Sequence, residues 1–258
     1  MEQMDCRFCT DDELGYLRSR TRFAAGEGLV LDESYRLAHL PLVAPAHPGV
    51  IARRDGNSDG LVGYEMGRHE RIFSLVVPVP AEALERSPAY RELNDELKAS
   101  PFAAKIAWNL LPERRDKLHA TICGSLSIGE EPPRLDSRVR AALAGHGPLQ
   151  VELRGLFSGN VNLGRLYLRA YPEFRNGVNM FRRLQMTLGR RETDLYVVGL
   201  HNLVDDLDAA EALFLAGMIE RWWDRPILRF CAETLWLLGA RDDLVLDSNI
   251  AEEIELSR

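Results

Sequence analysis

The stretch K-L-H-A-T-I-C-G, residues 117–124, has the alternation of a β-strand with one polar face. Successive side chains of a strand point to opposite faces, so the apolar residues point one way and His119 and Thr121 point the other. A single His–Thr pair on a strand is usually structural. The imidazole is then hydrogen-bonded to a carbonyl, and the threonine is present because it favours strands. A functional role for the pair depends on a partner strand elsewhere in the chain.

A second strand with a histidine is predicted at L-Y-V-V-G-L-H-N-L, residues 195–203. On strict alternation, His201 shares a face with Val197, Gly199 and Leu203. The two histidines lie 82 residues apart (201 − 119). Each sits at the same point of a repeated order of strand, helix, histidine-bearing strand, helix and strand. Two such strands related by a two-fold axis would bring both imidazoles to one groove.

The remaining periodicity predicts the other elements of both repeats. Helices are expected at 81–99, 135–144, 174–188 and 208–223, and strands at 73–79, around Trp108, at 149–157, 165–171 and 227–238. The first 70 residues are rich in turn signals and are predicted to form an extended arm or a lid, with one helix around 11–22. The histidines of this segment, His39, His47 and His69, lack spaced partners and are expected at the surface.

Composition and charge restrict the classes of function. The chain has 258 residues, 46% hydrophobic and 28% charged, as in a soluble globular protein. Its net charge of −7 argues against a duplex-DNA binder, although a small phosphorylated ligand needs only a few local donors. With no long apolar run and no secretory signal, we expect a cytoplasmic protein without a membrane span. The C-x-x-C of Cys6 and Cys9 has no second pair of metal ligands, so no metal site is predicted.

H-A-T-I at 119–122, followed by a second histidine strand, resembles the two-histidine phosphoesterase superfamily of LigT-like 2′-5′ RNA ligases and cyclic nucleotide phosphodiesterases. That family carries two copies of His-hydrophobic-Thr/Ser-hydrophobic about eighty residues apart. The second copy is expected at H-N-L-V, 201–204, where Leu203 replaces the hydroxyl and Asn202 an apolar residue. The resemblance covers residues from about 71 to 256.

The resemblance implies an α+β fold with two pseudo-symmetric lobes of antiparallel sheet, flanking helices and a groove between the lobes. Residues 71–258 would form this phosphoesterase-like domain, and residues 1–70 an N-terminal extension. It also implies a phosphodiesterase without metal or cofactor, acting on a 2′,3′-cyclic or 2′-5′-linked nucleotide or RNA end.

Two imidazoles with pKa values near 6.5 suit that chemistry, since one can act as base and the other as acid at neutral pH. Thr121 would donate to the phosphate. Because Leu203 lacks a hydroxyl, Asn202, turned inward by a β-bulge, or Arg165 would replace it.

Two other interpretations remain open. The chain could be a non-catalytic nucleotide or RNA-end binding module on the same fold, which Leu203 favours, or an unrelated α+β protein with two core histidines. Tyr167 and Trp108 are core residues in the simplest view, but either could stack a nucleobase. The basic clusters near Arg114 and Arg182 are expected to be solvated faces.

Overall fold

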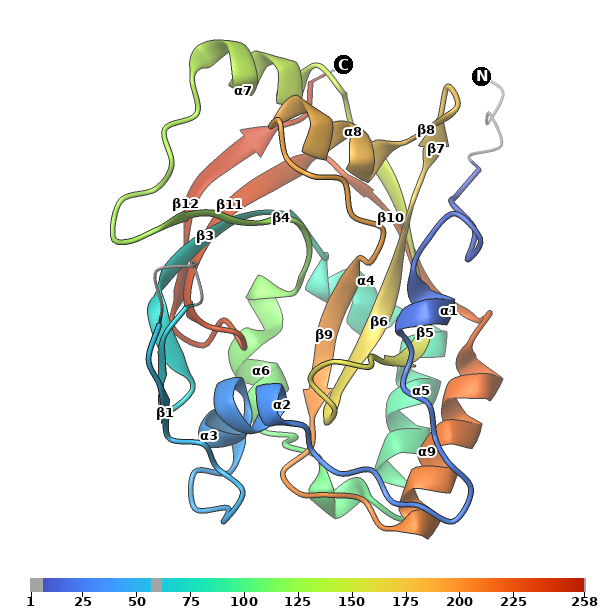
Figure 1. Cartoon of the computed structure of the whole chain (residues 1–258). Coiled ribbons are helices and arrows are strands. Elements are labelled where there is room, and N and C mark those ends of the chain that lie inside the picture. Colours follow the sequence, from blue (N-terminus) through green and yellow to red (C-terminus); the bar gives the residue numbers. More distant parts are fainter. Residues whose placement is uncertain (1–6, 57–61, 258) are drawn as a thin grey trace.

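A large antiparallel β-sheet with helices around it is the main feature of the computed structural model, which describes residues 7–56 and 62–257 (Figure 1). Across the sheet the longer strands follow the order β12 (Ser248–Glu255), β11 (Thr234–Asp242), β3 (Arg68–Pro78), β4 (His119–Ile128), β9 (Val197–Asn202), β6 (Arg165–Pro172), β5 (Leu149–Ser158) and β10 (Pro226–Ala232). A small hairpin of β1 (Arg53–Arg54) and β2 (Tyr64–Glu65) joins the start of β3. The predicted α+β class with antiparallel sheet is confirmed.

The two middle strands of the sheet, β4 and β9, are joined by one residue pair, Ala120 with Val198. Their outer neighbours are paired much more fully, β3 with β4 and β6 with β9. The ladder therefore stops beside His119 and Gly199, which flank this single pair. Side chains at that place are free to border a pocket rather than a continuous sheet surface.

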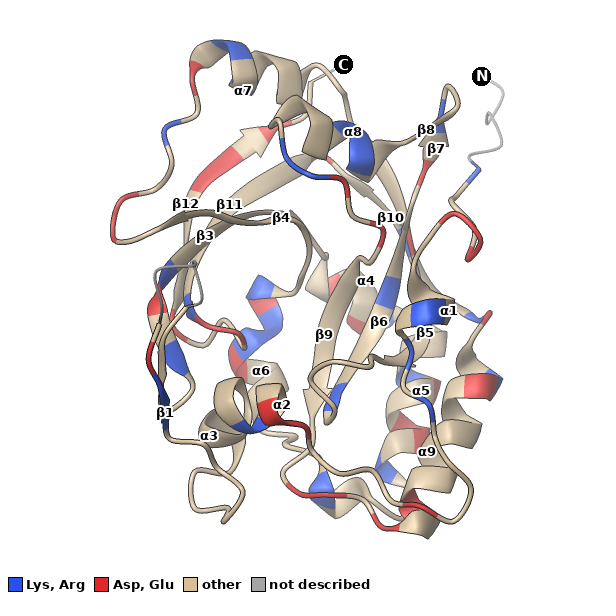
Figure 2. Cartoon of the chain, in the orientation of Figure 1, with Lys and Arg blue, Asp and Glu red and all other residues tan. Residues whose placement is uncertain are grey.

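In the view of Figure 1, α7 and α8 lie at the top of the sheet, and α5, α6 and α9 lie in its lower half. Helices α5 and α9 contact β10 and β5, α6 contacts β9, and α7 and α8 contact β12 and β4. Their bounds are α4 (Ala81–Arg86), α5 (Pro88–Lys98), α6 (Leu110–Arg114), α7 (Ser137–Ala144), α8 (Met180–Thr187) and α9 (Ala209–Trp222). Charged residues are spread over the helices and outer strands, whereas β9 carries none (Figure 2). Among the described residues, no helix has both the length and the apolar character needed to cross a membrane.

Two predicted elements differ because of local turn chemistry. The helix expected at 81–99 is two helices, since Pro88 starts a new one and the Ser87 side chain accepts its Tyr90 amide. The strand expected around Trp108 is wrong: this segment holds the 3-10 turn η1 (Ala103–Lys105) and then α6. Pro112 lies in the first turn of α6, where its missing N–H costs nothing.

Two further departures concern chain reversals. The helix expected from residue 174 starts at Met180, after a hairpin of β7 (Phe174–Arg175) and β8 (Val178–Asn179). Asn176 and Gly177 both have positive φ, as a two-residue hairpin turn requires. The strand expected at 227–238 is two strands, because β10 pairs with β5 whereas β11 pairs with β3 and β12.

The described part of the N-terminal segment packs onto the sheet. It holds the short helices α1 (Tyr16–Ser19), α2 (Glu33–Ala38) and α3 (Leu40–Val43), so the helix expected at 11–22 is reduced to one turn. Tyr16, Leu31 and Tyr35 are buried in the same apolar cluster as the central strands. The Tyr35 hydroxyl donates to the carbonyl of Leu203 at 2.6 Å, which fixes α2 at the end of β9. The predicted arm is therefore part of the main core, and a domain boundary at residue 70 stays a prediction.

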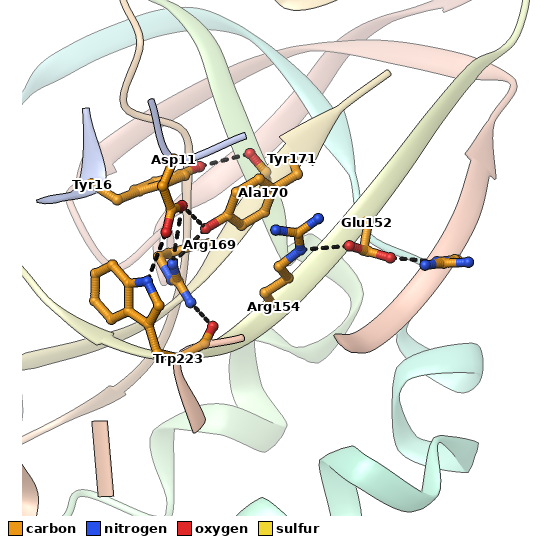
Figure 3. A network of polar contacts seen from close by, with 9 residues as sticks. Asp11, Tyr16, Glu152, Arg154, Arg169, Ala170, Tyr171 and Trp223 are labelled. Atoms are coloured by element: carbon orange, nitrogen blue, oxygen red, sulfur yellow. Dashed lines mark hydrogen bonds and ion pairs between the residues drawn. The ribbon is translucent and has the colours of Figure 1, made fainter. Parts of the chain in front are cut away.

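A buried polar network fastens the start of this segment to β6 (Figure 3). Arg169 of β6 is 0% exposed and donates to the Trp223 carbonyl and to the Tyr171 hydroxyl. Asp11 accepts from the Trp223 indole at 2.7 Å and from Arg169 at 3.4 Å. The carboxylate thus balances a guanidinium that has no access to water.

Candidate functional site

A pocket of about 360 Å³ opens beside the short ladder between β4 and β9. This volume lies within the range of sites that hold small ligands. The walls come from β4, β6 and β9, from the segment of α6 and the 3-10 turn η2 (Arg115–Lys117), and from the turn after β11. Its polar lining consists of Arg114, Lys117, His119, Thr121, Asn162, Arg165, Tyr167 and Asp243.

His119 and Thr121 both line this pocket, as their shared strand face predicts. The Nδ1 of His119 lies 2.7 Å from the Lys117 carbonyl, to which it donates as an N–H. This contact assigns the proton to Nδ1 and leaves Nε2 as an acceptor. Burial, and next the charges of Arg165 and Arg114, lower the pKa of His119 to about 4. The imidazole is therefore neutral at pH 7.

His201 lies outside this pocket, so the predicted groove with both imidazoles is wrong. In the pairing of β6 with β9, Leu166 faces His201 and Tyr167 faces Gly199, which leaves Leu200 as an extra residue. Such a bulge resets the alternation of a strand. Gly199 consequently lines the pocket, whereas His201 is 2% exposed and places Nε2 3.1 Å from Oδ1 of Asn94 on α5.

The same bulge turns Asn202 toward the pocket side. Its Oδ1 accepts from Nη1 of Arg114 at 3.4 Å, so Asn202 supports a lining residue without lining the pocket itself. Leu203 is fully buried, and Trp108 packs against His201 with 4.8 Å between the ring centroids. Of these predicted residues, only Asn202 is therefore linked to the pocket.

Arg165 and Tyr167 are both brought into the pocket wall. Arg165 donates from Nη1 to the Asp243 carbonyl at 2.9 Å, and its guanidinium carbon lies 5.3 Å from the Tyr167 ring centre. A Cβ on Gly199 would overlap the Arg165 guanidinium, so the glycine provides the space that this side chain occupies.

Arg114 is a functional candidate that the sequence placed wrongly on a solvated face. It is 2% exposed and donates to the Gly199 carbonyl and to Asn202. Burial, and next the charge of Arg165, lower its pKa to about 9. Among the described residues neither guanidinium pairs with a carboxylate, and the Nε atoms of both lack a hydrogen-bond partner.

The lining carboxylate Asp243 and two histidines near it, His39 and His69, also escaped prediction. His69 places Nε2 3.4 Å from Oδ1 of Asp243, whose Oδ2 accepts from the Tyr64 hydroxyl at 3.1 Å. Burial disfavours both charges, but the mutual attraction outweighs it, so the pKa of His69 is raised and that of Asp243 is lowered to about 2. His39, fully buried against Tyr35, has its pKa lowered to about 3, mainly by burial. The expected surface positions of His39 and His69 are wrong, since no spacing in the sequence reports these tertiary contacts.

The pocket is locally positive in an acidic chain. It collects the cationic side chains of Arg114, Lys117 and Arg165 against the single carboxylate of Asp243, whereas the whole chain carries −7. Figure 2 shows the basic residues of α6 and β6 near the uncharged strand β9. A cavity of this charge concentrates anions, and its hydroxyl and guanidinium donors suit phosphate oxygens.

Comparisons with known proteins give no family assignment. No family model matches the chain, and no curated protein matches its sequence. The crystal structure of the protein TT0787 of Thermus thermophilus is similar to this chain with a TM-score of 0.40 and 12% sequence identity, over 72% of this chain and 97% of that one. At this TM-score the two folds are only loosely alike, and we infer nothing about function from the likeness.

Proposed function

We propose that this protein binds the phosphate group of a small phosphorylated ligand, a nucleotide or an RNA end, in the pocket beside β4 and β9. The observation that carries the proposal is the pair of guanidinium groups, Arg114 and Arg165, that face one pocket without a carboxylate partner among the described residues. Arg114 is buried and Arg165 lies half-buried near it, so the two like charges repel each other. A bound anion would relieve this repulsion and offset the loss of water around Arg114.

The donors around the pocket, three cationic side chains and a hydroxyl, suit the several oxygens and the double negative charge of a phosphate. Guanidinium groups bind phosphate oxygens with two parallel hydrogen bonds, and Thr121 and Lys117 add a hydroxyl and an ammonium to the same wall. Tyr167 lies under the Arg165 guanidinium, whose carbon is 5.3 Å from the ring centre, and this cation–π contact helps to hold the cation in the pocket wall. These groups serve binding without any change of protonation.

A two-fold relation between the halves of the sheet, which we propose here, would explain why binding is favoured over two-histidine catalysis. If the axis passes through the pair of Ala120 and Val198, the counterparts of His119 and Thr121 are Val197 and Gly199. The second motif would then be V-V-G-L at 197–200, without histidine or hydroxyl. On this proposal the halves are pseudo-symmetric lobes, and only the first retains the polar pair.

Hydrolysis with a single histidine is the second candidate, favoured by the proton assignment of His119. Its Nδ1 is held by the Lys117 carbonyl, so Nε2 is an acceptor that could take a proton from a water or a ribose hydroxyl. A cyclic nucleotide cleaved in this way would need its leaving oxygen protonated by solvent. We therefore expect slow turnover, if any, compared with an enzyme that has both groups.

Binding is tested with probes that differ in one feature. Isothermal titration and thermal shift would compare sulfate, AMP, 2′-AMP, 3′-AMP and adenosine on the wild type, Arg165→Met and Arg138→Met, since Arg138 is exposed on α7 and serves as the matched control. We expect the phosphorylated probes to bind the wild type and Arg138→Met, with affinity at least tenfold lower in Arg165→Met.

Adenosine that binds as tightly as AMP, or an Arg165→Met variant that binds AMP like the wild type, would contradict the proposal. The same samples are then assayed for cleavage of 2′,3′-cyclic nucleotides and 2′-5′-linked oligonucleotides with EDTA present. Turnover that disappears in His119→Gln, while AMP still binds, would favour the single-histidine enzyme over the binding module.

A further inference from the structure

A second cavity, of about 240 Å³, lies between α4, α5, α6 and the end of β9, apart from the anion pocket. The chain of α6 and η2 separates the two: Leu111 and Arg115 face the second cavity, while Arg114 and Lys117 face the first. The lining of the second cavity is largely aliphatic and aromatic, with Tyr90 and Trp108 as its rings. An engineered cavity of about 150 Å³ holds benzene. This one therefore has room for a fused two-ring molecule.

The most deeply buried polar group of this cavity is His201, which is 2% exposed, and Glu85, Asn94, Lys98 and Arg115 also line it. Its Nε2 lies 3.1 Å from Oδ1 of Asn94, an oxygen that can only accept, so Nε2 carries the hydrogen. Burial, and next the charge of Arg114, lower the pKa of His201 to about 3, so the ring holds one proton at pH 7. Nδ1 is then a bare acceptor, and it has no hydrogen-bond partner among the described residues.

An unpaired buried acceptor is costly and calls for a donor that the described residues do not supply. The Trp108 indole N–H is already bound to the Ala103 carbonyl at 2.9 Å, so only its ring surface is available to a guest. The Arg115 charge is neutralised by two contacts with Glu85, at 2.6 and 2.8 Å. Lys98 also lines the cavity, but its side chain is 63% exposed and its Nζ lies 3.9 Å from Oδ1 of Asp95. The interior therefore suits a guest without charge.

We propose that this cavity is a separate binding site for a neutral, planar, fused heteroaromatic molecule with one ring N–H, which donates to Nδ1 of His201. The ring system fills the apolar volume against Trp108 and Tyr90, and the N–H satisfies the buried acceptor. The site does not depend on the function proposed for the anion pocket.

The test compares indole with benzofuran, which has the same shape but an oxygen in place of the N–H. Affinities are measured by isothermal titration on the wild type, His201→Phe and Thr121→Val, the last being a variant of the anion pocket. On the wild type we expect indole to bind roughly five- to tenfold tighter than benzofuran. In His201→Phe this ratio should fall to about one, and in Thr121→Val it should stay unchanged.

A measurement on the wild type keeps the test valid if His201→Phe does not fold. Indole should move the ¹⁵N resonance of Nδ1 of His201 in the direction of an accepted hydrogen bond, and benzofuran should leave it in place. Equal affinity for the two probes, no binding of either, or loss of the indole preference in Thr121→Val would overturn the proposal.

Discussion

Gly199 on β9 gives up the space that the Arg165 guanidinium of β6 occupies, because a Cβ on the glycine would overlap its nitrogen atoms. The two residues lie on neighbouring strands next to the bulge at Leu200. The position of a pocket cation is thus set by the absence of a side chain on the adjacent strand. A small side chain introduced at Gly199 should therefore displace the Arg165 guanidinium without disturbing the packing of the core.

Gly199→Ala should weaken anion binding with little effect on stability. The overlapping group is the far end of a flexible side chain, so the guanidinium would shift instead of the backbone. We expect sulfate and AMP affinities to fall about tenfold, and the free energy of unfolding to change by less than about 1 kcal/mol. Gly124→Ala is the matched control, because a Cβ there meets nothing within 4 Å. An unchanged sulfate affinity in Gly199→Ala would show that Arg165 does not contact the anion.

Anion binding should be linked to protonation of His119. Its pKa is lowered to about 4, first by burial and also by Arg165 and Arg114, and a bound dianion would offset the effect of both cations. The pKa therefore rises on binding, so the protein takes up protons between about pH 4 and the higher value, and affinity strengthens as pH falls. Sulfate isolates this effect because it does not titrate in that range. Titration calorimetry at pH 5 in buffers of different ionisation enthalpy measures the uptake, and His119→Gln should abolish it.

Features that depend on neighbouring residues of one strand or helix were predicted correctly from the sequence more often than features that depend on contacts between distant residues. Period-2 alternation places His119 and Thr121 on one face correctly, because both lie before any irregularity in β4. The same rule fails for His201, since one extra residue at Leu200 reverses the faces. The local sign of this bulge is Gly199, because a glycine within a strand often indicates a bulge. The break at Pro88 could have been predicted, as proline after serine is a common start of a helix.

The burial of Arg114, His39 and His69 could not be predicted from local sequence patterns, because it depends on contacts with residues far away in the chain. Arg114 looks like part of a solvated cluster, yet it is buried because α6 folds against β9. His39 and His69 reach the back of the pocket only because the N-terminal segment and β3 pack beside the turn that holds Asp243. Burial of this kind is a property of tertiary packing, and sequence spacing carries no record of it.

Acid should destabilise the fold through the histidines whose pKa values are lowered in the folded state. In the unfolded chain these imidazoles protonate near pH 6.5, whereas His39 and His201 have pKa values lowered to about 3 and His119 to about 4. Between these limits the unfolded state binds more protons, so stability falls as the pH drops from about 6.5 toward 3. His69 acts in the opposite sense, because its pKa is raised in the folded state.

Urea unfolding at pH 7, 5 and 4 measures this dependence. His201→Phe should show a shallower loss of stability with acid than the wild type, since phenylalanine does not titrate and one source of the pH dependence is removed. Identical slopes for the two proteins would mean that His201 is not buried in its neutral form.

The contact of Asp11 with Arg169 should contribute strongly to stability (Figure 3). The Arg169 guanidinium is 0% exposed, and the carboxylate of Asp11 lies beside it and balances its charge. Burial already lowers the pKa of Arg169, and removal of Asp11 would leave the charge without compensation and the Trp223 indole N–H without its acceptor. We expect Asp11→Ala to cost about 3–5 kcal/mol of unfolding free energy, the range for breaking one side of a buried pair. Asp12→Ala, on the exposed neighbour, should change the free energy of unfolding by less than about 0.5 kcal/mol.

A second background identifies the cause of the effect. In Arg169→Met, the further change Asp11→Ala should lower the free energy of unfolding far less, because no buried charge remains. An equal cost of Asp11→Ala in both backgrounds would instead trace the effect to its contacts with Trp223 and Tyr171.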